Sequence, residues 1–429
     1  MMNARINRWL PKGSFLRNVT ILTVGTVFAQ ALMVAALPML TRLYSPEDFS
    51  LLAVYVAIIS IVTVVSCLRY NIAIPLPEHD ADGIALLAVA LLAACVVSML
   101  CALPVILAPE ATARLIGQLG LRPYLWMVPV GVFIASVYNA LQYWASRKKR
   151  FALVTQTRMT RAVGGVGTQL GLGVVNPAPF GLIFGHMIYG GLGIAGLFRN
   201  LVRDDRALLG ELERSNMQKQ ARTYRRFPLY SVPEALFNTA GAQLPLIIIA
   251  AMVAGPEAGF LFLAMRVMGL PMGLVGSSIA QVFLAEAPAK LRDGTLADFT
   301  RRTMWLLFRT GAPVMIAVGV IAPLFFPLVF GPEWARAGWL VAWMTPWFVL
   351  QFVASPVSMA IHVLGHQRMA LALQVAGLVL RVGAVLIAGA VSLEERTSEI
   401  FALSGAVFYG IYIGCVYFTI SAPRSVSAG

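Results

Sequence analysis

The sequence predicts an all-α polytopic membrane protein with twelve transmembrane helices in two six-helix lobes around a central cavity. Of its 429 residues, 59% are hydrophobic and 12% are charged, whereas soluble domains contain about 45–50% apolar and about 25% charged residues. The apolar residues also occur in runs of about 20 or more, which as helices match a hydrocarbon core about 30 Å thick. This composition excludes an ordinary soluble enzyme.

The first six spans form the first half of the chain. The first apolar run, Val19 to Leu40, is too long for the apolar region of a signal peptide, so we expect it to be a retained span. A GxGxxG pattern begins at Gly191 in span 6; since it follows no strand, we expect it to serve close helix packing and not dinucleotide binding. The expected spans are 19–41, 50–67, 84–107, 123–143, 152–175 and 179–198.

The last six spans form the second half. Because a proline removes a backbone hydrogen bond, Pro233, Pro245 and Pro271 are expected to bend spans 7 and 8. The expected spans are 230–253, 257–286, 303–329, 338–363, 369–391 and 398–420.

The basic residues indicate the orientation. If both termini are cytoplasmic, the termini and inner loops contain 23 Lys and Arg residues, and the outer loops contain 5. Positive residues accumulate on the cytoplasmic side, so we expect both termini there. The outer loops are short, so no catalytic domain outside the membrane is expected.

The two halves resemble each other. The string SPEDFSLLAVYV from Ser45 is similar to GPEAGFLFLAMRV from Gly255, 210 residues later. Parallel repeats of this kind are typical of transporters whose substrate site lies between two lobes. We therefore expect an N-terminal lobe at 1–198, a cytoplasmic segment at 199–228 and a C-terminal lobe at 229–429.

Several arginines lie inside the predicted spans. Arg266 and Arg381 are near the midplane, and Arg158 and Arg161 share one face of span 5. Such residues are costly in a membrane and usually face a cavity or a partner. One interpretation is structural pairing with Glu234, carbonyls or lipid phosphates. The other is a cationic cavity for an anionic group, since a guanidinium can bind phosphate oxygens in pairs.

Glu234 is the one acid placed well within a predicted span, and Asn238 lies one turn further on the same face. We expect Glu234 either to load and release a proton during transport or to stay ionised beside a cavity arginine. The four cysteines show no metal-binding spacing, and no metal, cofactor or nucleic acid is expected.

Five strings carry a resemblance to a known family: LTRLYSPEDFSLLAVYV from Leu40, LRYNIAIPLP from Leu68, RFPLYSVPEALFNTAGAQLP from Arg226, RVMGLPMGLVGSSIAQVF from Arg266 and FGPEWARAGWL from Phe330. They resemble bacterial polysaccharide-biosynthesis membrane proteins, the O-antigen-type lipid-linked oligosaccharide flippases of the MOP exporter superfamily. Asn71 departs from this family, which often has Glu after the Arg-Tyr pair that here is Arg69-Tyr70.

The resemblance implies two lobes that alternate between inward-open and outward-open states. It implies a substrate, an undecaprenyl-diphosphate-linked oligosaccharide moved to the outer leaflet, with membrane lipids and polysaccharide polymerase or assembly proteins as partners. The diphosphate would bind Arg158, Arg161, Arg266 and Arg381. Three alternatives remain: a drug or cation antiporter of the same superfamily, a peptidoglycan-precursor flippase, and a membrane-embedded glycan polymerase, which would be an enzyme.

Overall fold

The structure, a computed structural model, describes residues 15–253, 255–364 and 366–421. Over these residues the chain is helical, and no strand occurs among them. This confirms the predicted all-α fold class. The chain divides into two compact units: the first contains the residues up to Tyr44 together with Ile58–Leu236, and the second contains Ser45–Ala57 and the residues from Phe237 onward.

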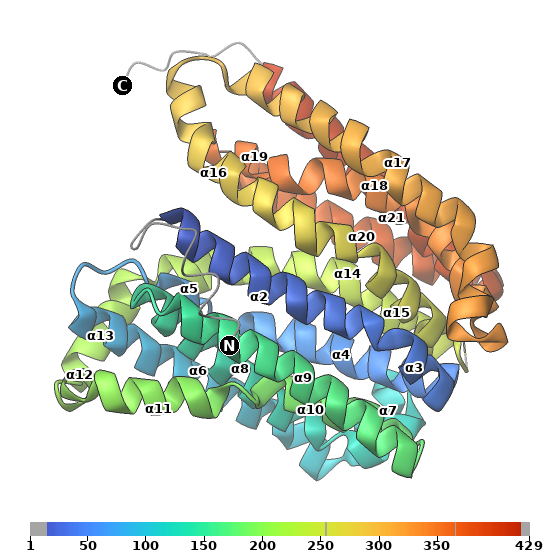
Figure 1. Ribbon diagram of the computed structural model, residues 1–429, viewed down its shortest axis with the longest axis horizontal. Helices are drawn as coiled ribbons and strands as arrows, with labels where there is room; N and C mark the ends of the chain where they lie inside the picture. The colour runs from blue at the N-terminus through green and yellow to red at the C-terminus, as the bar shows by residue number, and fades with distance from the viewer. Residues whose placement is uncertain (1–14, 254, 365, 422–429) are drawn as a thin grey trace. The chain divides into compact units, whose positions relative to one another are not determined.

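The first unit is built around α8 and α9. Helix α9 packs against α2 and α10, and α8 packs against α6, α10 and α11 (Figure 1). Buried side chains of α6 and α8, among them Leu86 and Trp144, form its core. Its elements are α2 (Phe15–Ala35), α3 (Leu37–Leu43), α4 (Pro46–Ser66), α5 (Tyr70–Ala73), α6 (Asp80–Leu107), α7 (Pro109–Ile116), η1 (Leu119–Tyr124), α8 (Met127–Arg147), α9 (Phe151–Val175), α10 (Pro179–Gly191), α11 (Ile194–Asp204), α12 (Arg206–Gly210), α13 (Arg214–Thr223) and η2 (Phe227–Ser231).

The second unit is built around α18, which packs against α15, α17 and α21. Figure 1 shows α17, α18 and α21 running side by side. The elements are α14 (Val232–Met252), α15 (Glu257–Met268), η3 (Met272–Gly276), α16 (Ser277–Arg292), α17 (Leu296–Phe330), η4 (Pro332–Trp334), α18 (Ala335–Val357), α19 (Met359–Val363), α20 (Gln367–Ala390), η5 (Glu394–Arg396) and α21 (Thr397–Ser421).

Each of the twelve expected spans lies on one or more of these helices. Within the described ranges, nine helical segments are long and apolar enough to cross a membrane. The other three spans are more polar or interrupted: α8 carries Asn139 and Arg147, α9 carries Arg158 and Arg161, and the span expected at 257–286 is divided into α15, η3 and α16. The chain is thus a multi-pass membrane protein.

The helix is irregular near two of the three prolines that were expected to bend it, since the π-helical turn η2 ends at Ser231, two residues before Pro233, and η3 follows Pro271. Helix α15 ends at Met268, and the π-helical turn η3 begins directly after Pro271. Helix α14 begins at Val232, next to Pro233, and continues through Pro245. A ring without a backbone N–H therefore interrupts the helix in span 8 and is accommodated within a continuous helix in span 7.

Helix α4 belongs to both units, because its residues up to Ala57 pack with the second unit and those from Ile58 pack with the first. The start of α4 contacts α15 closely because residue 259 is a glycine. A Cβ atom at Gly259 of α15 would lie 2.1 Å from the carbonyl oxygen of Pro46. Beside it, the rings of Phe49 and Trp334 meet edge to face at 4.9 Å. The two similar strings of the sequence thus begin two helices that pack against each other at their N-terminal ends.

Candidate functional site

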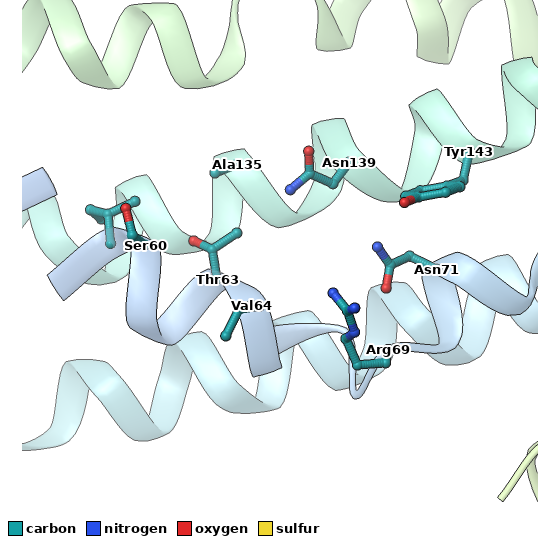
Figure 2. Close-up of a pocket in the computed structure, with 9 residues that line it drawn as sticks. Ser60, Thr63, Val64, Arg69, Asn71, Ala135, Asn139 and Tyr143 are labelled. Atoms are coloured by element: carbon teal, nitrogen blue, oxygen red, sulfur yellow. The ribbon is translucent and has the colours of Figure 1, made fainter. Parts of the chain in front are cut away.

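The first unit contains a cavity of about 370 Å³ between α4 and α8, next to the turn that joins α4 to α5. Figure 2 shows side chains of α8 facing those of α4 and the turn. Its volume is at the lower end of the range of small-molecule sites, about 300–1,000 Å³. It is lined by Ile59, Ser60, Thr63 and Val64 of α4, Arg69 of the turn, Asn71 of α5, and Ala135, Asn139 and Tyr143 of α8.

Helical spacing explains how these residues share one space. Ala135, Asn139 and Tyr143 are four residues apart, so they form a stripe along one side of α8. Ser60 and Thr63 are one turn apart on the opposing part of α4. These polar residues are placed within otherwise apolar helices, which is typical of side chains that line a cavity in a membrane protein.

An unusual turn places Arg69 at the end of this cavity. Leu68 and Arg69 both have a left-handed backbone, with φ of 47° and 61°, a conformation that costs a residue with a side chain about 1–2 kcal/mol. The next residue holds the turn in place, because the hydroxyl of Tyr70 donates a hydrogen bond of 3.0 Å to the carbonyl oxygen of Ala221. Such strain persists where the surrounding structure enforces it, and it often marks a functional site.

The Arg69 guanidinium is half-buried and incompletely bonded. Its Nε atom is buried and, in the part of the chain that the structure describes, has no hydrogen-bond partner. Burial lowers the pKa of the Arg69 guanidinium, and its electrostatic interactions with Tyr143 and Glu234 act in the opposite direction. A buried donor that lacks a partner costs about 1–3 kcal/mol, so an anionic ligand that accepts from Arg69 would remove that penalty.

The cavity presents cationic and neutral polar groups. None of its nine described lining residues is an aspartate or glutamate. Thr63 contributes a second buried polar atom, Oγ1, without a partner among the described residues. The lining side chains therefore favour an anionic ligand over a cationic one, and the carboxylate of Glu234, which acts on Arg69, lies outside this lining. No group of three or more His, Cys, Asp or Glu residues within the described ranges could hold a metal ion.

Two arginines expected at the substrate site lie on α9. Arg158 donates a hydrogen bond of 2.7 Å from Nη1 to the hydroxyl of Thr26 on α2. Arg161 stacks on aromatic rings, with Cζ 3.7 Å from the ring centre of Tyr138 and 4.5 Å from that of Tyr189. It also donates from Nε to the carbonyl oxygen of Tyr189. Both side chains therefore help to join helices of the first unit.

The other two expected arginines lie in the second unit. Arg381 of α20 is only 4% exposed, and its Cζ lies 4.3 Å from the ring centre of Phe408, with the rings of Trp347 and Tyr409 at 5.6 and 5.4 Å. Two of its donors, Nε and Nη2, are buried without hydrogen-bond partners among the described residues. Arg266 is half-buried near the end of α15.

Glu234 and Asn238 lie in the first two turns of α14. Glu234 is half-buried and Asn238 is exposed. The charge of Glu234 acts on Arg69 of the first unit, to which Glu234 also belongs. The structure thus brings Glu234 near an arginine that lies outside the predicted spans.

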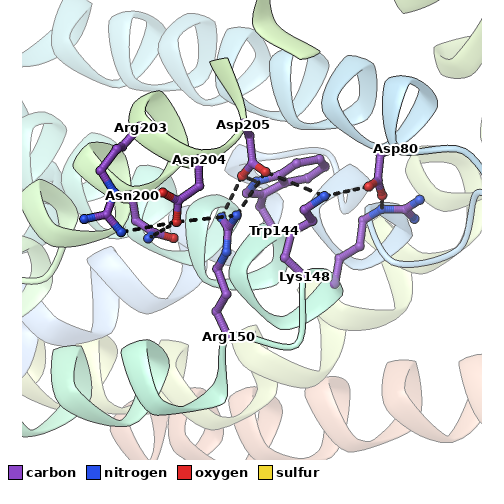
Figure 3. Close-up of polar contacts among 9 residues, drawn as sticks. Asp80, Trp144, Lys148, Arg150, Asn200, Arg203, Asp204 and Asp205 are labelled. Atoms are coloured by element: carbon purple, nitrogen blue, oxygen red, sulfur yellow. Dashed lines mark hydrogen bonds and ion pairs between the residues drawn. The ribbon is translucent and has the colours of Figure 1, made fainter. Parts of the chain in front are cut away.

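A charged network at one end of the first unit was not expected from the sequence (Figure 3). Asp205, whose side chain is 3% exposed, accepts hydrogen bonds from Trp144 at 2.9 Å and from both terminal nitrogens of Arg150 at 2.6 and 3.0 Å. Lys148 lies between two carboxylates, 2.6 Å from Asp80 and 3.6 Å from Asp205. These contacts join the start of α6, the end of α8 and the junction of α11 with α12.

Comparison with known proteins identifies a family. The family model described as a polysaccharide biosynthesis protein matches residues 39–338, well over half of the chain. A search of curated proteins finds no match to this sequence.

Solved structures share the fold over nearly the whole chain. An inward-facing multidrug resistance MATE family transporter of the MOP superfamily is 15% identical, with 96% of this chain and 99% of that chain covered at a TM-score of 0.61. The lipid II flippase MurJ in an inward closed conformation is 10% identical, with 94% and 88% covered at a TM-score of 0.71. A MOP superfamily transporter from Pyrococcus furiosus, described as having a binding pocket of reversed polarity, is 14% identical, with 95% and 96% covered at a TM-score of 0.56.

At these identities the likeness shows the fold alone. These neighbours are two-lobe transporters of twelve helices, which confirms the fold class predicted from the sequence.

Proposed function

Because the chain belongs to the polysaccharide biosynthesis protein family, we propose that it is a flippase for a lipid-linked oligosaccharide. It moves an undecaprenyl-diphosphate-linked glycan from the inner to the outer leaflet of a bacterial inner membrane by alternating access, for the assembly of a polysaccharide such as O-antigen. In this proposal both termini are cytoplasmic, and the protein is a transporter and not an enzyme.

The observation that carries the proposal is the cationic cavity around Arg69. It lies between the membrane helices α4 and α8, contains an arginine with a buried donor that has no partner among the described residues, and has no carboxylate among its described lining residues. An arginine that binds oxygen pairs is the side chain best suited to a diphosphate. Arg69 is therefore proposed as a contact to the anionic part of the substrate.

We propose that Arg266 and Arg381 in the second unit, with Arg158 and Arg161 in the first, also contact the diphosphate during the transport cycle. Arg381 supports this most directly, because it has two buried donors without hydrogen-bond partners among the described residues. Glu234 is proposed to stay ionised as the electrostatic partner of Arg69, with Asn238 next to it on α14. The driving force would then come from an ion gradient, the membrane potential or consumption of the product outside.

A drug or cation antiporter is the second candidate, because a multidrug transporter shares the fold. Such a protein needs an acidic group where its cation binds. The charge of the cavity around Arg69 favours the flippase.

The test is transport in proteoliposomes that contain a fluorescent undecaprenyl-diphosphate-linked glycan. Arg69→Ala should slow flipping by about tenfold or more, the effect of losing one charge-assisted hydrogen bond of about 1.5–3 kcal/mol. Arg309→Ala is the matched control, since Arg309 is an exposed arginine of α17. Normal flipping by Arg69→Ala would remove the cavity from the mechanism, and uptake of organic cations by the wild-type protein would favour the antiporter.

A further inference from the structure

We propose that the cavity between α4 and α8 binds a sugar residue of the glycan, next to an anionic group held by Arg69. This inference rests on the proposed function, because it names the part of the flipped substrate that occupies the cavity. It gives a role to the neutral polar side chains of the cavity, because the binding of an anion alone does not need them.

Three neutral side chains in the cavity have hydrogen-bonding groups that the described residues do not use. Asn71, Asn139 and Tyr143 are half-buried, and the described residues supply no side-chain hydrogen bond to any of them. Each asparagine offers two donors and one acceptor, and the tyrosine hydroxyl offers one of each. Membrane helices rarely carry three such groups in one place without a partner.

The mixture of donors and acceptors matches a polyhydroxylated ring. Every sugar hydroxyl both donates and accepts a hydrogen bond, so amides and hydroxyls bind sugars in either direction. A purely anionic ligand would leave the amide oxygens of Asn71 and Asn139 without donors. Figure 2 shows that Asn71 and Arg69 lie across the cavity from Asn139 and Tyr143, so groups on both sides can reach one ligand.

The size of the cavity limits what it can take. A volume of about 370 Å³ equals about a dozen waters at ~30 Å³ each. This accommodates a sugar residue with its hydroxyl groups but not a whole oligosaccharide. The position of Arg69 at one end places the anionic group at the edge of the sugar. That group is either the diphosphate that carries the sugar or a carboxylate of an acidic sugar.

The experiment measures the affinity of the full-length protein in lipid nanodiscs for three ligands. These are undecaprenyl diphosphate, the same lipid carrying one neutral hexose, and the same lipid carrying one hexuronic acid. The wild-type protein should bind the two sugar-bearing lipids more tightly than the bare lipid. Asn139→Ala and Tyr143→Phe should each weaken binding of the sugar-bearing lipids by about 3- to 10-fold and leave binding of the bare lipid unchanged.

Tyr143→Phe removes a single hydroxyl and keeps the ring, so a loss in that variant is not a failure to fold. Asn176→Ala, which changes an exposed asparagine at the end of α9, should change none of the affinities. Arg69→Gln identifies the anionic group. A loss with the bare lipid assigns Arg69 to the diphosphate, and a loss only with the hexuronic acid lipid assigns it to the carboxylate.

Equal affinities for all three lipids in the wild-type protein, or losses that do not depend on the sugar, would overturn this inference and leave the flippase proposal standing. Unchanged affinities in Arg69→Gln would overturn the anionic contact. A wild-type protein that binds none of the three lipids would overturn the proposed function itself.

Discussion

Arg381 lies deep in an apolar unit with aromatic rings around it. Phe408, Trp347 and Tyr409 all lie within 6 Å of its guanidinium carbon, and no ion pair to it occurs within the described ranges. Contacts of a cation with an aromatic face contribute about 0.5–2 kcal/mol each, which offsets part of the cost of the buried charge.

Two substitutions of Arg381 should separate the effect of its charge on export from the effect of its forked guanidinium group. Arg381→Ala should abolish export of surface glycan while the protein still inserts, and Arg381→Lys should retain only part of it, because an ammonium cannot bind two phosphate oxygens as a fork. Glycan on the cell surface and protein in the membrane fraction are measured together. Full export by Arg381→Ala would show that the arginine serves packing alone.

Glu234 gives a second prediction for a single residue. As the electrostatic partner of Arg69, it should act through its charge and not by carrying protons. Glu234→Gln should therefore slow flipping in proteoliposomes but leave the response to an imposed pH gradient unchanged. If the response to the gradient disappears instead, Glu234 is a proton carrier; Glu211→Gln, at an exposed glutamate next to α12, is the control.

Hydropathy locates a membrane span but misses the polar residues that form the first turn of its helix. Span 2 was expected to begin at residue 50, but α4 begins at Pro46, because a Pro-Glu-Asp sequence is polar and still favours the first turn of a helix. Proline fits there without losing a hydrogen bond, and acidic side chains interact well with the helix N-terminus. The same Pro-Glu pair begins α7 at Pro109 and η4 at Pro332.

The twelve spans could be predicted because the apolar composition of a run is enough to indicate that it lies in the membrane. Contacts between distant helices could not. Asp205 and Trp144 are 61 residues apart in the sequence, and basic residues near Trp144 are explained equally well by membrane orientation. For the same reason the sequence did not predict that Asn139 and Tyr143 line a cavity, because the cavity exists only where α4 lies opposite them.

The network that joins α6, α8 and α11 provides a prediction at the scale of these elements. Asp205→Ala should lower the free energy of unfolding by about 3 kcal/mol, because removal of one partner leaves buried charges uncompensated. Thermal unfolding followed by intrinsic fluorescence would show a lower Tm. Asp204→Ala is the matched control: its carboxylate is 33% exposed, so its ion pairs should contribute only about 0–1 kcal/mol. Equal shifts in the two variants would contradict this account.

For the whole molecule, the basic residues predict the orientation in the membrane. The segment 199–228, expected to be cytoplasmic, contains 8 Lys and Arg residues, and those of α13 are exposed. Reporter fusions at Gly210 and Gly429, the latter outside the described residues, should be inactive when the reporter works only in the periplasm. Periplasmic activity at either position would reverse the topology.

The two similar strings begin helices that contact each other within the second unit. The backbone of Pro46 packs so closely against Gly259 that a larger side chain there would clash with it. Gly259→Val should therefore destabilise the second unit. The two similar strings thus meet at the starts of two helices, a contact that no comparison of the strings alone could predict.

The left-handed turn at Leu68 and Arg69 also matters to anyone who wishes to purify this protein. Leu68 is 36% exposed, so packing compensates only part of the cost of the unfavourable backbone there. Glycine adopts the same conformation without a steric penalty, and Leu68→Gly leaves the Arg69 side chain in place. Position 68 is therefore a rational first choice for a thermostabilised variant, suited to detergent extraction and electron cryomicroscopy.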